Sequence, residues 1–361
     1  MRITRLAARS VVVMTVALLM VTNGIVRATA GDAGARQPEP AGLVAVSGDL
    51  RGVAATSVSN AWAVGSAGSG KTLILRWNGK TWKRVPSPSP SGSYLAGVAA
   101  TSARNAWAVG GTGSGRTLIL RWNGVAWKQV PSLAGSLSSV AAVSATDAWA
   151  VGGKLILHWN GIAWKPMPVP RVKGTAYLAA VAASSGSNAW AVGETVSGSS
   201  PMTSLILRWN GKAWRRVRSP GPRYGQYGNA LAGVATTSGG NAWAVGCTDG
   251  CPVGGTPMIK RWRGKSWKQV AAPATPYALY NLTAVATTSA ASAWAVGGGG
   301  PVTSESAAIA HWNGRRWTLN HGIPGAGLEA VTATSAKNAW AVGGTVKGRI
   351  LILRWNGTRW S

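Results

Sequence analysis

One short pattern recurs seven times along the chain, and it limits the folds that this sequence can adopt. The string Ala-Trp-Ala-Val-Gly returns every 41 to 53 residues, and each copy is followed by Arg/His-Trp-x-Gly-x-x-Trp. The tryptophans of the first string are Trp62, Trp107, Trp149, Trp190, Trp243, Trp294 and Trp340. Those of the second are Trp77/Trp82, Trp122/Trp127, Trp159/Trp164, Trp209/Trp214, Trp262/Trp267, Trp312/Trp317 and Trp355/Trp360. Three per repeat account for all 21 tryptophans, so we expect one structural unit repeated seven times.

Each repeat contains four short apolar runs separated by turn residues. In the second repeat they are residues 95–102, 106–110, 118–122 and 127–131. The first run is rich in Gly, Ala, Ser and Thr, whereas the tryptophans lie in the other three. Such a gradient suits a wedge that widens away from a central axis. We therefore predict an all-β, seven-bladed β-propeller with four antiparallel strands per blade, whose closure removes exposed sheet edges.

The connection between the third and fourth runs contains Asn-Gly in six of the seven repeats, with Arg263 replacing Asn in the fifth. Asn-Gly favours a two-residue hairpin loop. With Asn78–Gly79 as the loop, Trp77 pairs with Lys80 and Leu75 with Trp82, which places the tryptophans on one face of the sheet.

The N-terminal segment has the features of a secretory signal. Three arginines within the first nine residues precede the apolar run 11–21, and residues 28–30 form a small-x-small cleavage site. We predict a signal peptide at 1–30, a linker at 31–41 and the propeller at 42–361; an uncleaved anchor is the alternative. The mature chain is then secreted, with no membrane span. Because the last repeat stops at Trp360-Ser361, we also predict that residues 43–46 complete the seventh blade.

The charge balance argues against most catalytic and metal-binding chemistries. There are 37 Lys+Arg against 8 Asp+Glu, a net charge of +29, with 3 His and 2 Cys. Eight acids leave few candidates for paired-carboxylate catalysis, and two cysteines with three histidines leave little for a zinc site. The acids within the repeats lie singly along the chain: Asp49, Asp147, Glu194, Asp249, Glu305 and Glu329. We expect no enzyme, no cofactor and no metal site.

Two local motifs look chemical. Residues 65–72 match the phosphate-loop pattern, but they lead into a strand rather than the helix that phosphate binding requires, so we interpret them as a hairpin. Cys247 and Cys251 lie in one short loop of an exported chain, where a disulfide is favoured over a metal site that would need two more ligands.

An arginine recurs directly before the first tryptophan of the Arg/His-Trp-x-Gly-x-x-Trp string. These residues are Arg76, Arg121, Arg208, Arg261 and Arg354, with His158 and His311 as variants. Because they repeat together with the core motif, we interpret them as structural groups stacked or bonded between blades.

The six tyrosines fall in the connectors between successive repeats, together with basic residues. Tyrosine beside Arg, Ser and Gly on variable loops is typical of a recognition surface; capping of the barrel end is the alternative. The predicted ligand-binding residues are Tyr94, Arg171, Lys173, Tyr177, Arg223, Tyr224, Tyr227, Tyr277 and Tyr280.

The repeat, Asn-Ala-Trp-Ala-Val-Gly followed by Leu-Ile-Leu-Arg-Trp-Asn-Gly-x-x-Trp, resembles the repeats of secreted bacterial β-propellers and is similar to the tectonin repeat. The resemblance covers about residues 49 to 361. Tectonin-type proteins are lectins of innate defence, so the resemblance implies a carbohydrate ligand. The repeats of this chain are longer and far more basic than that pattern.

Two functions follow from these observations. The first is a secreted, monomeric, non-enzymatic binding protein that recognises an anionic glycan or cell-envelope polymer through one loop face. The second is an adhesion or assembly scaffold with a protein partner. We do not expect nucleic acid, because the chain is exported and its basic residues are spread over the repeats.

Overall fold

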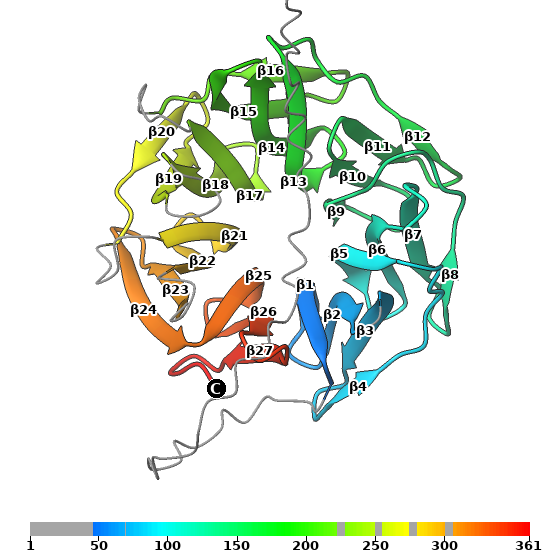
Figure 1. Cartoon of the computed structure of the whole chain (residues 1–361). Coiled ribbons are helices and arrows are strands. Elements are labelled where there is room, and N and C mark those ends of the chain that lie inside the picture. The colour runs from blue at the N-terminus through cyan, green and yellow to red at the C-terminus, as the bar shows by residue number, and fades with distance from the viewer. Residues whose placement is uncertain (1–45, 69, 222–227, 250–254, 274–279, 300–305) are drawn as a thin grey trace, which may run out of the picture. The chain divides into compact units, whose positions relative to one another are not determined.

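The computed structural model describes residues 46–68, 70–221, 228–249, 255–273, 280–299 and 306–361. Every regular element in these ranges is a β-strand, and the strands form seven sheets around a central axis (Figure 1). The predicted all-β, seven-bladed propeller is therefore confirmed. The predicted signal peptide and linker lie outside the described residues.

In each blade the chain runs from the axis outward, and neighbouring strands are antiparallel. Blades 1 and 2 comprise β1 (Gly48–Ser57), β2 (Asn60–Ala67), β3 (Lys71–Trp77), β4 (Trp82–Arg84), and β5 (Tyr94–Ser102), β6 (Asn105–Gly111), β7 (Thr117–Trp122), β8 (Trp127–Gln129). Blades 3 and 4 comprise β9 (Ser139–Ala142), β10 (Ala148–Gly152), β11 (Leu155–Trp159), β12 (Trp164–Pro166), and β13 (Thr175–Ser185), β14 (Asn188–Ser197), β15 (Ser200–Trp209), β16 (Trp214–Val217). Blades 5 and 6 comprise β17 (Asn229–Ser238), β18 (Asn241–Thr248), β19 (Thr256–Trp262), β20 (Trp267–Val270), and β21 (Tyr280–Ser289), β22 (Ser292–Gly299), β23 (Ser306–Trp312), β24 (Trp317–Pro324). Blade 7 comprises β25 (Ala326–Ser335), β26 (Asn338–Thr345) and β27 (Ile350–Trp355).

The innermost strands carry small residues and a bulge. In β1 the register skips one residue between Leu50 and Gly52, so Arg51 is the bulged residue. The same skip occurs at Ala96, Ala179, Ala232, Thr283 and Glu329. Because a bulge turns its residue out of the regular pairing, these positions line the central channel.

The turn between the third and fourth strands differs from the prediction. Trp77 pairs with Trp82 and Arg76 with Lys83, so the loop has four residues rather than two. The side-chain oxygen of Asn78 accepts hydrogen bonds from the backbone N–H groups of residues 80 and 81, each at 2.9 Å. This Asx turn widens the loop. Since the pairing differs from the prediction by two residues, Trp77 and Trp82 still share one face of the sheet.

Three tryptophans join each blade to the next. Trp62 of blade 1 lies 5.0 Å from Trp122 and 5.1 Å, edge to face, from Trp127 of blade 2. Trp340 of blade 7 makes the same contacts with the first blade, at 5.0 Å from Trp77 and 5.1 Å from Trp82. The ring therefore closes with the same packing that joins its other blades.

The seventh blade ends with very short pairing. Trp360 bridges Trp355, and the backbones of Ser361 and Arg354 exchange two hydrogen bonds of 2.9 and 3.0 Å. At the start of the described chain, Ser47 bridges Arg349 beside β27. Because residues 43–45 lie outside the described ranges, completion of this blade by residues 43–46 stays a prediction.

Candidate functional site

The recurring arginines of the third strands hold neighbouring blades together. The guanidinium of Arg76 lies 5.0 Å from the ring centre of Trp62 and 5.4 Å from that of Trp122 in the next blade. It also donates a hydrogen bond to the carbonyl of Ala103, at 3.2 Å. Stacking between two blades recurs at Arg121, Arg208, Arg261 and Arg354. Their interpretation as structural residues is confirmed.

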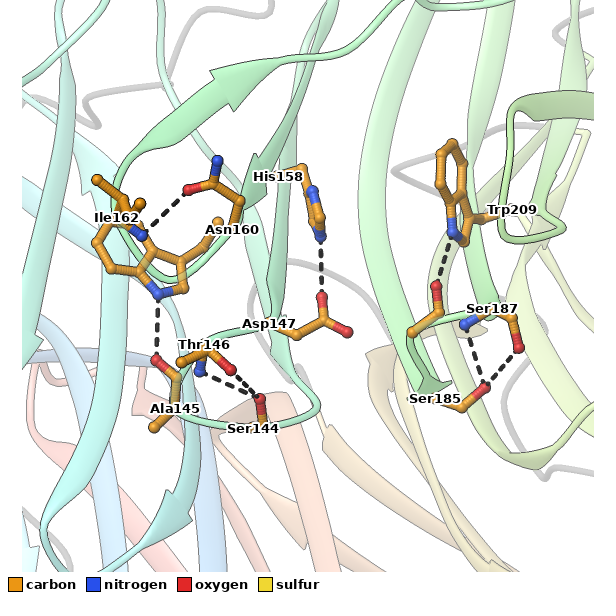
Figure 2. A network of polar contacts seen from close by, with 12 residues as sticks. Ser144, Ala145, Thr146, Asp147, His158, Asn160, Ile162, Ser185, Ser187 and Trp209 are labelled. Atoms are coloured by element: carbon orange, nitrogen blue, oxygen red, sulfur yellow. Dashed lines mark hydrogen bonds and ion pairs between the residues drawn. The ribbon is translucent and has the colours of Figure 1, made fainter.

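The two histidine variants are structural as well. His158 stacks on Trp149 at 4.2 Å, and its Nε2 lies 2.9 Å from a carboxylate oxygen of Asp147 (Figure 2). His311 stacks on Trp294 at 4.1 Å, and burial lowers the pKa of its imidazole. The part of the chain that the structure describes holds no group of three His, Cys, Asp or Glu side chains that could bind a metal ion.

The structure places the predicted ligand residues in two different settings. Tyr94, Tyr177 and Tyr280 lie in the first three residues of β5, β13 and β21, so they belong to inner strands rather than to connectors. The reason is that the second strand of each blade continues past its Ala-Trp-Ala-Val-Gly string and pairs with them. Arg171 and Lys173 are exposed in the connector between β12 and β13. The remaining four are outside the described residues: Arg223, Tyr224, Tyr227 and Tyr277.

A charged cluster that the sequence analysis missed surrounds Tyr94. The guanidinium of Arg51 lies 5.5 Å from the centre of the Tyr94 ring and forms an ion pair with Asp49. Asp49 also accepts a hydrogen bond of 2.5 Å from the hydroxyl of Ser66. Arg51 was visible as a break in the repeat, because the matching residue is uncharged in five of the other six repeats.

Two residues of this cluster, Asp49 and Arg51, line a groove of about 440 Å³ between blades 7 and 1, and Glu329 is the third charged lining residue. The groove opens beside the central channel, whose own cavity is about 160 Å³ and is lined by the inner strands of all seven blades. The channel cavity is far below the size of ordinary small-molecule sites. The groove has the volume for a small ligand.

The loop face, at the ends where the inner strands begin, is mixed in charge. Tyr177 is 37% exposed there, and it pairs in register with Glu194. Burial raises the pKa of the Glu194 carboxyl. Recognition on this face would therefore combine an exposed aromatic ring with nearby groups of both signs.

The outer strands are different, because five of the six carry Lys or Arg and none of the six carries Asp or Glu. In five blades the outer strand begins with a tryptophan that is followed by a cation. We call these five residues the rim cations: Lys83, Lys128, Lys165, Arg215 and Lys268. All five are exposed. Four of them stand directly opposite an arginine of the third strand. Within the described ranges, no carboxylate forms an ion pair with a rim cation.

The remaining motifs have the following outcomes. Residues 71–77 form β3 rather than a helix, which confirms that the phosphate-loop pattern is part of a hairpin. Cys247 is buried at the end of β18, but Cys251 lies outside the described residues, so their disulfide stays a prediction. Among the described residues, no helix long and apolar enough to cross a membrane occurs.

Comparisons with known proteins identify the fold. No protein-family model and no curated protein matches the chain. Among solved structures, YCF48 bound to D1 peptide has a TM-score of 0.60 at 16% identity, covering 87% of this chain and 93% of that chain. The BP39L lectin from Burkholderia pseudomallei gives 0.61 at 13% identity, covering 88% and 98%. The WD40 β-propeller domain of Doa1 gives 0.59 at 13%, covering 86% and 95%. At these identities the likeness concerns the propeller fold alone.

Proposed function

We propose that this chain is a secreted, non-enzymatic binding protein for an anionic glycan or another anionic polymer of a cell envelope. The observation that carries the proposal is the set of rim cations, which are exposed in five blades and form no ion pair with a carboxylate of the described residues. A polymer with many negative groups can contact several blades at once, and such multivalency strengthens binding without any single strong site. The signal-peptide pattern supports an extracellular ligand.

The loop face offers a further contact for the same polymer. We propose that Tyr177, Arg171 and Lys173 contact it there, since the exposed ring can stack on a sugar and the two cations can meet its charges. The solved propeller described as a lectin supports a carbohydrate ligand for this architecture.

The test is equilibrium binding of the mature chain to acidic and neutral glycans, lipopolysaccharide, anionic vesicles and DNA, at low and physiological salt. Selective binding to an acidic glycan at about 150 mM salt supports the proposal, since exposed charges alone are strongly screened there. Equal binding to every polyanion, lost with salt, would refute selective recognition. Tyr177→Ala should weaken glycan binding without moving Tm, because the ring is partly exposed.

The alternative is a scaffold with a protein partner, favoured by the charged groove between blades 7 and 1. Asp49, Arg51 and Glu329 offer both signs of charge there, which suits a peptide better than a polyanion. The solved YCF48 structure contains a bound peptide. Partner binding that survives high salt, together with no binding to acidic glycans, would favour this function over the first.

A further inference from the structure

Three departures of repeats 4 and 5 from the shared sequence each add a cation. Arg218 stands where the first three repeats have proline, and Lys260 stands where five other repeats have leucine. Arg263 replaces the asparagine of all six other repeats. Residues shared by every repeat serve the fold, so departures from the repeat are candidates for function.

One of these departures, Arg218, lines a groove between the outer strand of blade 4 and the outer hairpin of blade 5. The groove has a volume of about 320 Å³. Its lining includes Arg218, Lys265 and Lys268, which are all exposed, together with Val217, Pro220 and the hydroxyl-bearing Ser266. It therefore combines three cations with a small apolar surface, at the lower end of the size range for small-molecule sites.

Lys260 lies beside the chain segment that forms one wall of the groove. Its side chain is fully buried, and its ammonium donates hydrogen bonds to Ser204 at 3.0 Å and to Ser219 at 2.6 Å. Ser219 sits between Arg218 and Pro220, so the buried ammonium fixes the wall that presents Arg218. Lys260 is a positioning residue for the groove.

The neighbouring Arg261 points to the other face of blade 5, away from the groove. Arg261 is 7% exposed and stands directly opposite Lys268 in the sheet. Its Nε–H has no acceptor within the described ranges. Its guanidinium stacks on Trp243 and Trp312 and donates a hydrogen bond of 2.6 Å to the carbonyl of Ala290, so this cation belongs to the boundary with blade 6 and the groove cations act without it.

We propose that this groove binds the sulfate or phosphate ester groups of an anionic polymer, an inference that rests on the proposed function and adds a site to it. Such groups present several acceptor oxygens at once, which suits the combination of a guanidinium and two ammonium groups. The sugar carrying the ester would lie against Val217 and Pro220. Since both ester types share this chemistry, the experiment includes both.

The test compares a groove variant with a variant of equal charge elsewhere. The groove variant is Arg218→Gln with Lys265→Gln, which leaves every rim cation in place. The control is Lys80→Gln with Arg104→Gln, because Lys80 holds the position in the hairpin of blade 1 that Lys265 holds in blade 5. Binding of each protein to dextran sulfate, phosphorylated dextran and neutral dextran is measured at about 150 mM salt.

We expect the groove variant to lose about tenfold or more in affinity for a charged dextran, and the control less than about threefold. The dextran that shows the larger difference identifies the ester type. Equal losses in both variants would overturn the groove site while leaving polymer binding, and so the proposed function, intact.

A second measurement keeps the two proposals distinguishable. Glucose 6-sulfate and glucose 6-phosphate are titrated into the isotope-labelled chain, and the amide signals of residues 217–219 and 265–268 are followed by NMR. Shifts confined to these segments support the groove even if no dextran binds, an outcome that would count against the proposed function alone. Absence of shifts with both sugars would overturn the groove.

Discussion

Replacement of Lys260 by leucine, the residue that five other repeats have at this position, should stabilise the protein. Burial lowers the pKa of the Lys260 ammonium from 10.5 to about 8. The folded state therefore binds this proton less tightly than the unfolded chain does. At pH 7 this difference in pKa lowers the free energy of unfolding by about 3 kcal/mol.

The sign follows from the two pKa values. Between pH 8 and 10.5 the unfolded chain holds more protons at this residue, so the stability of the wild type rises with pH over that window. Below about pH 8 the penalty is present in full. The Lys260→Leu variant lacks this dependence, so its advantage should be largest at pH 7 and should shrink as the pH approaches 10.5.

The hydrogen bonds lost with the ammonium reduce the gain only modestly. Ser204 and Ser219 lie 2.8 Å apart and remain bonded to each other. We expect a net gain of about 2 to 3 kcal/mol at pH 7, equivalent to a rise in Tm of about 4 °C for a domain of this size.

The assay is urea unfolding followed by tryptophan fluorescence, for wild type, Lys260→Leu and the control Lys260→Met, at pH 7 and pH 10. A difference between wild type and Lys260→Leu that is equal at both pH values would refute the argument. So would a loss of stability in Lys260→Leu at pH 7, because the ammonium would then be a net stabilising group. Lower affinity for a charged dextran in this more stable variant would separate positioning of the groove from a purely structural role.

Three further predictions concern the fold. Trp62→Ala should destabilise by about 3 to 5 kcal/mol in urea unfolding, because the ring is fully buried between two blades; a change below about 1 kcal/mol would contradict that packing. Arg263→Asn should stabilise by about 1 kcal/mol, because it restores the Asx turn and removes a cation that adds to the effect of burial in lowering the pKa of Arg261, and an unchanged denaturation midpoint would count against this. Since burial lowers the pKa of His311, the folded state should lose stability as the pH falls below 6.5, and His311→Gln should show a flatter Tm profile between pH 7 and 5.

The sequence predicts the architecture well because its strongest signal is repeated. Each tryptophan is part of a contact that must recur at every blade boundary, so spacing alone counts the blades. The turn register was wrong for a local reason. Asn-Gly favours a two-residue loop, but the side chain of Asn78 can also accept hydrogen bonds from two backbone groups, and that geometry wins here.

The candidate sites were less accessible from the sequence. The first residues of the inner strands precede the apolar run that marks each strand in the sequence. Tyr94 and Tyr177 were therefore predicted to lie in loops. Arg51, Arg218 and Lys260 could have been noticed as departures from the repeat. Arg218 and Lys265 are far apart in sequence. They line one groove because blade 4 packs against blade 5.

The contact between Trp340 and Trp77 has a consequence for how this molecule could be re-engineered. The boundary between blades 7 and 1 is packed in the same way as the boundary between blades 1 and 2, so the order of the blades along the chain and their order around the ring are separable. A circularly permuted gene, opened between β8 and β9 and joined across the original ends, should give a ring with the same seven seams. Two fragments divided at such a seam should likewise reassemble through their tryptophans.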